Sequence, residues 1–239
     1  MRALVGAELK KLATTRMPFL LAVGAVVIST VTVLDPEHSA ATFQKPFDEQ
    51  TFVLFSAMLT RILIVVLGVR AMTDEVRYNT IVPTFLVTPS RTKVLGAKAI
   101  AVGAAGAAIA LLAWASMFAA ASVIAASDGT SIAFDAGVTR SLIGTVGAGA
   151  AWAIVGLGVG AIVRGQVLAT VGSVLWLMGI EEAVRGWLGD LDRYLPGQAG
   201  LAMAIAPTMK ALLLGGGVMI AYALITTLAS GLAIRRDVA

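Results

Sequence analysis

Few side chains in this sequence could take part in chemistry, and they lie in three places. Glu181 and Glu182 stand beside Arg185 at the end of an apolar run, and paired carboxylates can act as general acid and base. Arg61 lies near the middle of another apolar run. The third place is the polar stretch 73–98, TDEVRYNTIVPTFLVTPSRTKVLGAK, which carries mixed charge and two prolines between two apolar segments.

None of these groups completes a known catalytic or metal site. The chain has no cysteine and one histidine, His38, and it lacks a phosphate-binding lysine loop, an HExxH zinc motif and a GxSxG elbow. The segment Glu181-Glu182-Ala183-Val184-Arg185 resembles the first motif of the intramembrane CPBP proteases, but that family adds histidine motifs that are missing here. We interpret it as a local ion pair at the outer surface, with i,i+4 and i,i+3 spacings. We expect no catalytic residue and no metal site.

The composition indicates that most of the chain lies in lipid. Of its 239 residues, 58% are apolar and 13% are charged, and the mean hydropathy is +0.90. Soluble domains carry about 25% charged residues, so this chain cannot cover its own surface with water-compatible groups. We predict an all-α integral membrane protein with a single transmembrane domain over residues 1–239. The basic residues lack interleaved aromatic residues, so we expect no nucleic-acid partner.

The apolar runs predict six transmembrane helices. A short amphipathic helix at 1–16 would lie on the membrane surface, with a solvated tail as the alternative. A cleavable signal peptide is disfavoured because the following apolar run exceeds the usual length of about 7–15 residues. Between the fifth and sixth spans, 199–206 is apolar enough to form an external re-entrant segment. The predicted spans are 17–34, 51–72, 97–126, 141–163, 167–188 and 211–234.

Two of these spans carry features of their own. In the fourth, Gly156 and Gly160 form a GxxxG pair, which in membranes favours close approach of helices. In the fifth, Glu181 and Glu182 interrupt the apolar run, so the helix either continues to about Leu188 or stops short of the acids.

The loop charges predict an orientation. Six spans place both termini on one side, and the loops on that side hold twelve of the eighteen Lys and Arg residues, against five on the other side. Cytoplasmic loops are enriched in Lys and Arg, so both termini should be cytoplasmic and the chain a multi-pass protein of the plasma membrane.

Arg61 is expensive to bury, at about 2.5–3.5 kcal/mol near the centre of a span. It should therefore face a polar cavity, a carboxylate or a helix end. Two interpretations stay open: Arg61 lines a substrate path, or it forms a structural pair with an acidic group.

The polar stretch predicts local structure. Thr73-Asp74-Glu75 reads as the start of a new helix, with a capping hydroxyl followed by acids at the positive end of the helix dipole. Pro83 and Pro89 would divide the remainder into short pieces. An ordinary solvated loop is the alternative.

The stretch also resembles a known family. The pattern Glu75-x-x-x-Asn79-Thr80-Ile81, Thr84-x-Leu86, Thr88-Pro89-x-Arg91 and Lys98 is similar to the permease subunits of type-2 ABC exporters, although Asn79 stands where glycine is common. The resemblance extends over the whole chain, from the amphipathic N-terminal helix to Leu195-Pro196 before the last span.

The resemblance implies a transport subunit without enzymatic activity of its own. The chain would be half of a permease dimer, with an identical or related second copy, and would dock on a separate ATP-binding subunit that holds ATP and magnesium. The polar stretch would form a cytoplasmic coupling helix, and the cargo would be amphipathic, like a drug, lipid or peptide. The implied coupling residues are Glu75, Arg77, Thr80, Arg91 and Lys93, and the candidate path residues between the second and fifth spans are Thr60, Arg61, Ser173 and Trp176.

Two other classes of function remain open. A stand-alone secondary carrier could use Arg61 and external acids for ion coupling, although no internal repeat of the kind such carriers contain is evident. A membrane protein without transport activity, such as an immunity or assembly factor, is the third possibility.

Overall fold

The computed structural model describes residues 1–34, 49–78, 90–127 and 129–236, and every regular element in these ranges is helical. In lipid every backbone N–H and C=O group must bond within the protein, which favours helices. The prediction of an all-α membrane protein is therefore confirmed. The elements are α1 Arg2–Thr14, α2 Arg16–Leu34, α4 Glu49–Arg77, α6 Arg91–Ser127, α7 Ala136–Val163, α8 Gln166–Leu175, η1 Trp176–Ile180, α9 Glu181–Leu188, η2 Gly189–Tyr194, α10 Pro196–Ile205 and α11 Met209–Arg236.

Five helices in the described part are long and apolar enough to cross a membrane, which indicates a multi-pass membrane protein. They cover Arg16–Leu34, Thr92–Ser127, Ala136–Val163, Gln166–Tyr194 and Met209–Ala233.

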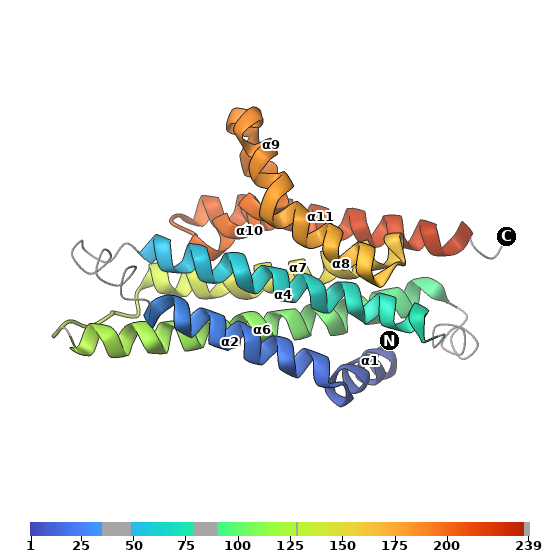
Figure 1. Ribbon diagram of the computed structural model, residues 1–239, viewed down its shortest axis with the longest axis horizontal. Helices are drawn as coiled ribbons and strands as arrows, with labels where there is room; N and C mark the ends of the chain where they lie inside the picture. The colour runs from blue at the N-terminus through green and yellow to red at the C-terminus, as the bar shows by residue number, and fades with distance from the viewer. Residues whose placement is uncertain (35–48, 79–89, 128, 237–239) are drawn as a thin grey trace.

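The helices form an elongated bundle around α7 (Figure 1). In α7, 56% of the residues in its apolar stretch are buried inside the protein, against 17% in α2 and 11% in α11. Helices α4, α6, α10 and α11 all pack against it, while α2 lies outside against α6 and α4. The N-terminus of α1 and the C-terminal end of α11 lie at the same end of the long axis (Figure 1).

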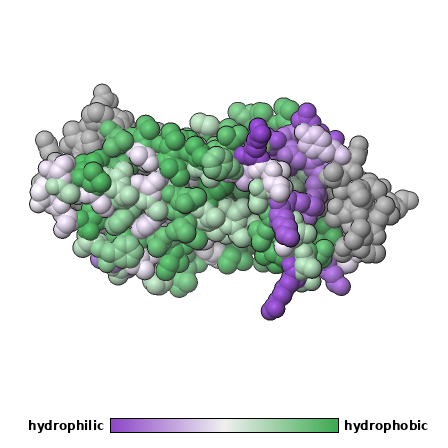
Figure 2. Space-filling view, turned by 90° about the horizontal axis from the view of Figure 1, so that it is seen from below, coloured by the Kyte–Doolittle hydropathy of each residue, from purple (hydrophilic) through white to green (hydrophobic). Residues whose placement is uncertain are grey.

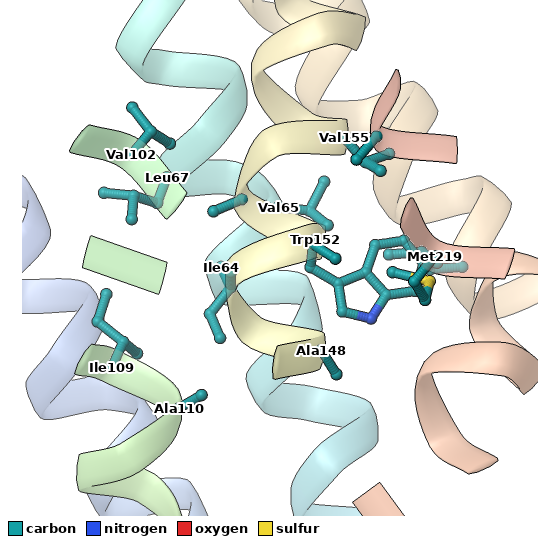
Figure 3. Close-up of a cluster of buried hydrophobic side chains, with 14 of the residues drawn as sticks. Ile64, Val65, Leu67, Val102, Ile109, Ala110, Ala148, Trp152, Val155 and Met219 are labelled. Atoms are coloured by element: carbon teal, nitrogen blue, oxygen red, sulfur yellow. The ribbon is translucent and has the colours of Figure 1, made fainter. Parts of the chain in front are cut away.

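Close helix contacts fill the core, where α4, α6, α7 and α11 contribute the buried side chains (Figure 3). Gly156 lies against the backbone oxygen of Val65, and a Cβ added at Gly160 would lie 2.6 Å from the backbone oxygen of Val69. The two glycines thus let α7 touch the backbone of α4 along two successive turns. In a membrane, removing apolar side chains from lipid contributes little to helix association. Close van der Waals packing, which these two glycines allow, therefore contributes more to the stability of the α4–α7 pair.

The fifth span is helical throughout but bent. It begins directly after a tight turn, in which Arg164 adopts a left-handed conformation (φ 59°). The π-helical segment Trp176–Ile180 then separates α8 from α9, and α9 projects away from the bundle in Figure 1. π-helical turns are a recognised cause of sharp bends in helices. Of the two alternatives left open by the sequence, the helix continues to Leu188.

Several predicted boundaries are wrong. Thr73 does not start a helix, because α4 runs unbroken to Arg77 and the Thr73 hydroxyl donates to the Val69 carbonyl one turn back. The gap between the predicted spans 97–126 and 141–163 is shorter than predicted, since α6 continues to Ser127 and α7 begins at Ala136 with Asp135 as its N-cap. The stretch 186–207, which contains the expected re-entrant segment 199–206, is largely helical, and within it α10 packs against α7 and α11.

Candidate functional site

Polar residues gather at the end of the bundle where α1 lies, while the surface beyond is largely apolar (Figure 2). Helix α1 ends at Thr14, and Thr15 breaks it from α2 with an extended backbone conformation (φ −92°, ψ 141°). The break lets α1 turn away from α2 and pack against α6. The sequence predicts an amphipathic helix here, whose apolar residues would be expected to pack inward. Instead Leu9 is exposed, and the most buried residue is Glu8.

Glu8 belongs to a network in which four charged side chains of the described residues join α1, α4 and α6. The ammonium group of Lys98 lies 2.6 Å from Glu8 Oε2 and 2.8 Å from Glu75 Oε1. Lys11 lies 2.7 Å from Glu8 Oε1 and 3.0 Å from Glu75 Oε1. Two ammonium groups thus balance two carboxylates, and three of the four side chains are largely buried. We call these four residues the interfacial network.

The ionisation of the network follows from its geometry. Burial alone would raise the pKa of the Glu8 carboxyl, but attraction to Lys98 and hydrogen bonds from both lysines hold that pKa below its ordinary value of 4.5. Burial alone would lower the pKa of Lys11, but hydrogen bonds to Glu8 and Glu75 raise it above its ordinary value of 10.5. Glu8 and Lys11 are therefore both charged around neutral pH, and each has a partner of opposite sign.

The residues assigned to coupling occupy different environments. Glu75 is buried in the interfacial network, so it holds helices together rather than presenting a contact surface. Arg77 is exposed at the end of α4, and its Nη1 donates to Gln166 Oε1 at the start of α8 over 2.9 Å. Lys93 is exposed in the first turn of α6. Thr80, the two prolines and most of the expected coupling helix lie outside the described residues, as does the side chain of Arg91.

A second polar group lies deep in the bundle around Arg61. Its Nη1 donates to the backbone oxygen of Gly197 over 3.1 Å, and its Nη2 to that of Leu177 over 3.2 Å. Glu181 is 1% exposed, attracts Arg61 by its charge and accepts from the Gln198 backbone N–H over 3.1 Å. Arg61 therefore has a nearby carboxylate, one of the expected kinds of partner, and two backbone carbonyl groups, which belong to η1 and α10.

This arrangement corrects the interpretation of the paired glutamates. Arg185 pairs with Glu182 at 3.4 Å and with Asp192 at 3.3 Å, both near the surface. Glu181 is instead turned inward, with its carboxylate packed against Gly197. The sequence indicated this pairing in part. An arginine near the middle of a span needs a partner such as a carboxylate, and Glu181 follows directly after an apolar run. The bend at Trp176–Ile180, which orients Glu181, has no signal in the sequence.

The four candidate path residues do not form one site within the chain. Thr60 and Arg61 line a cavity of about 40 Å³ beside Trp114, Thr145 and Trp152, which has room for about one water molecule. The Ser173 hydroxyl donates to the Ala169 carbonyl of its own helix. Trp176 is 40% exposed on the outer side of the fifth span. These four residues therefore do not form a path for a drug-sized molecule within a single chain.

Among the described residues, no group of three or more His, Cys, Asp or Glu side chains could hold a metal ion. No protein-family model matches the sequence, and no curated protein matches it at a significant level of similarity.

Proposed function

We propose that the chain is the permease subunit of an ATP-driven exporter of the type-2 ABC kind. It would cross a bacterial plasma membrane six times, with α4 as the second span in addition to the five helices already identified, and both termini would be cytoplasmic. A separate ATP-binding subunit would hold ATP and magnesium, and a second permease copy would complete the path for an amphipathic cargo.

The observation that carries the proposal is the interfacial network. The segment between α4 and α6 is the expected contact with the ATP-binding subunit, and both flanking helices are tied to α1 by ion pairs at Glu75 and Lys98. A force applied to that segment would thus reach α1, α4 and α6 together. Rigid-body movement of packed helices is a common way to transmit a conformational change through a protein.

The proposal revises the roles of the coupling residues. Glu75 positions the helices, whereas Lys93 and Arg77 are exposed at the same end and are available to an approaching subunit. Arg77 also links the end of α4 to the start of the fifth span through Gln166. The second and fifth spans would then move as neighbours, which suits a path between the second and fifth spans of two copies.

The direct test is purification of the tagged chain from its native membrane in mild detergent, with chemical crosslinking to retain weakly bound subunits. A co-purifying subunit with a Walker motif and vanadate-sensitive ATPase activity would support the proposal. A crosslinked preparation with no such subunit and no ATPase activity would refute it.

The buried charges at Arg61 and Glu181 favour a second candidate, a stand-alone ion-coupled carrier. Ionisable residues within membrane spans often belong to proton or ion relays. This candidate predicts uptake or efflux driven by an ion gradient in vesicles that contain only the purified chain, with loss of transport in Glu181→Gln. Transport that requires ATP and the second subunit would exclude it.

A further inference from the structure

Helix α9 leaves the bundle sideways. In Figure 1 it runs across the long axis, whereas α2, α4, α6, α7 and α11 run along that axis. In the described part of the chain, the elements that pack against α9 are η1 and η2, its neighbours in sequence. The long helices cross the membrane together, so a helix that runs across them lies closer to the membrane plane than to the membrane normal.

The side chains of α9 are sorted onto two opposite faces. Ile180, Val184 and Trp187 follow one another at i, i+4 and i+7, which places them on one face, and all three are exposed, Trp187 to 91%. We call these three residues the apolar stripe. Glu182 and Arg185 lie on the opposite face and pair with each other. A helix with one apolar face and one charged face is suited to the surface of a bilayer.

The charged face of α9 is turned towards the end of the bundle opposite the termini. The side-chain amide of Gln198, on α10, donates to Glu182 Oε1 over 3.3 Å. Helix α11 follows α10 and ends beside the N-terminus, so α10 lies towards the other end of the long axis (Figure 1). The apolar stripe, on the face opposite Glu182, is therefore turned back along the bundle, towards the interior of the membrane.

The length of the preceding segment places α9 near the boundary of the hydrocarbon core. Helix α8 has 10 residues and η1 has 5, and together they rise about 22 Å from the turn at Arg164. The hydrocarbon core of a bilayer is about 30 Å thick, so the bend lies about 8 Å below its far boundary. Helices that lie in the plane of a bilayer bury their apolar face about 5–10 Å into this boundary.

The apolar stripe also continues a surface that faces lipid. Helix α8 belongs to one of the five helices that are long and apolar enough to cross a membrane. Its exposed large apolar side chains are Val167, Leu168, Val171 and Leu175. The stripe follows this surface beyond the bend and ends at Trp187, and tryptophan is enriched where the hydrocarbon core meets the headgroups.

We propose that α9 lies in the plane of the membrane and binds the lipid leaflet on the side away from the termini. The apolar stripe rests among the upper segments of the acyl chains, Trp187 anchors it at the boundary, and Glu182 and Arg185 lie in the headgroup layer. This inference requires only that the chain spans a membrane, so it does not depend on the transport function proposed above.

The test uses spin labels on the full-length, cysteine-free chain in nanodiscs of phosphatidylcholine and phosphatidylglycerol. Single labels at Val184→Cys and Trp187→Cys report on the apolar stripe, and a label at Glu182→Cys reports on the charged face. Labels in the stripe should be more accessible to oxygen, which concentrates in hydrocarbon, than to a water-soluble nickel chelate. The label at Glu182→Cys should show the reverse order.

Two reference positions calibrate these accessibilities. Val171→Cys on α8 reports a label in lipid, and Ser131→Cys, exposed between α6 and α7, reports a label in water. Greater accessibility to nickel in the stripe would show that it faces water and would overturn the proposal. Exclusion of both reagents, with dipolar broadening between labels at Trp187→Cys, would show that a second copy covers the stripe and would also overturn it.

A pair of variants then assigns the binding to the stripe. With the label at Val184→Cys, Trp187→Gln should raise the accessibility to nickel, because an amide replaces the ring that anchors α9 at the boundary. Arg185→Gln is the matched control, because it introduces the same residue on the opposite face of the same helix, and it should leave the label unchanged. An accessibility that is unchanged in Trp187→Gln, or that rises equally in Arg185→Gln, would overturn the proposal.

Discussion

Each buried charge in the described part of this chain has been placed beside groups that offset the cost of removing it from water. Lys98 lies between two carboxylates, and Arg61 lies between two backbone carbonyl groups and near Glu181. Removing one member of a buried ion pair costs far more than the pair contributes, because the remaining charge stays buried without its partner. The effect of a substitution at these positions therefore depends on the charge balance that it leaves behind.

The first prediction concerns Lys98. Lys98→Met removes an ammonium group that contacts both Glu8 and Glu75 and leaves these buried carboxylates with less positive charge beside them, so the free energy of unfolding should fall by about 3 kcal/mol. Adding Glu8→Gln removes one of these carboxylates, and the double variant should be more stable than Lys98→Met alone. Denaturant unfolding in mixed micelles measures both effects. Lys93→Met, in the same helix but exposed, is the control and should change little.

The second prediction is the pH range over which α1 stays docked. The pKa of Glu8 is lowered in the folded protein, so its stabilisation is present above 4.5 and is lost as pH falls below that value. The pKa of Lys11 is raised, so its stabilisation is present below 10.5 and is lost as pH rises above that value. Docking of α1 should therefore be constant between these limits and weaken outside them.

A probe on α1 can follow this docking. The chain has no cysteine, so Thr14→Cys, an exposed position at the end of α1, can carry a single spin label. The label should gain mobility below pH 4.5, and Glu8→Gln should remove that acid-induced change. Mobility that changes steadily across neutral pH would contradict the assignment.

At the scale of elements, contact between α4 and α7 depends on glycine. A Cβ at Gly160 would lie 2.6 Å from the Val69 backbone oxygen, and backbone atoms cannot move aside as a flexible side chain can. Gly160→Ala should therefore separate the helices and cost about 1–3 kcal/mol of unfolding free energy. Gly172→Ala in α8 is the matched control, since nothing lies within 4 Å of the added Cβ.

The two glycine substitutions should change the free energy of unfolding in opposite directions. At an exposed helical position alanine is favoured over glycine by about 1 kcal/mol, so Gly172→Ala should stabilise the protein slightly. Thermal unfolding in detergent compares the two. A destabilisation of the same size in both variants would contradict the prediction, because alanine at the close contact between α7 and α4 would then be no more destabilising than alanine at an open position.

The elements could be predicted from the sequence only as far as composition determines them. Apolar runs identify helices in lipid because no other backbone state is satisfied there. This is why five of the predicted spans coincide with helices that are long and apolar enough to cross a membrane. Helix ends and bends depend on tertiary contacts instead. The charges at Asp74 and Glu75 suggested a helix start, but Glu75 is bound by lysines from α1 and α6, and α4 continues past it. The bend at Trp176–Ile180 follows apolar residues that do not distinguish it from straight helix.

The candidate site could likewise be predicted only in part. The sequence showed that Arg61 needs a partner, but the partner comes from residues more than a hundred positions away, at Leu177, Glu181 and Gly197. The interfacial network joins Glu8 to Lys98 across 90 positions. Such pairs depend on which helices pack together, and a hydrophobic pattern within one helix carries no information about its neighbours.

At the scale of the whole molecule, orientation decides which partners are possible. The N-terminus and the end of α11 lie at one end of the bundle, with the interfacial network and the ends of α4 and α6 (Figure 1). The excess of Lys and Arg in the loops at this end predicts that it faces the cytoplasm. ATP is available there, so the proposed function requires this orientation.

The last prediction tests the orientation with single cysteines in the cysteine-free chain. Thr92→Cys lies exposed at the start of α6, and Ser131→Cys lies exposed between α6 and α7, near the opposite end of the bundle. A membrane-impermeant maleimide added to intact cells should label Ser131→Cys and should label Thr92→Cys only after permeabilisation. The reverse pattern would place the α4–α6 connection outside the cell. No ATP-binding subunit could then reach it, and the ion-coupled carrier with Arg61 and Glu181 would be the better explanation of the fold.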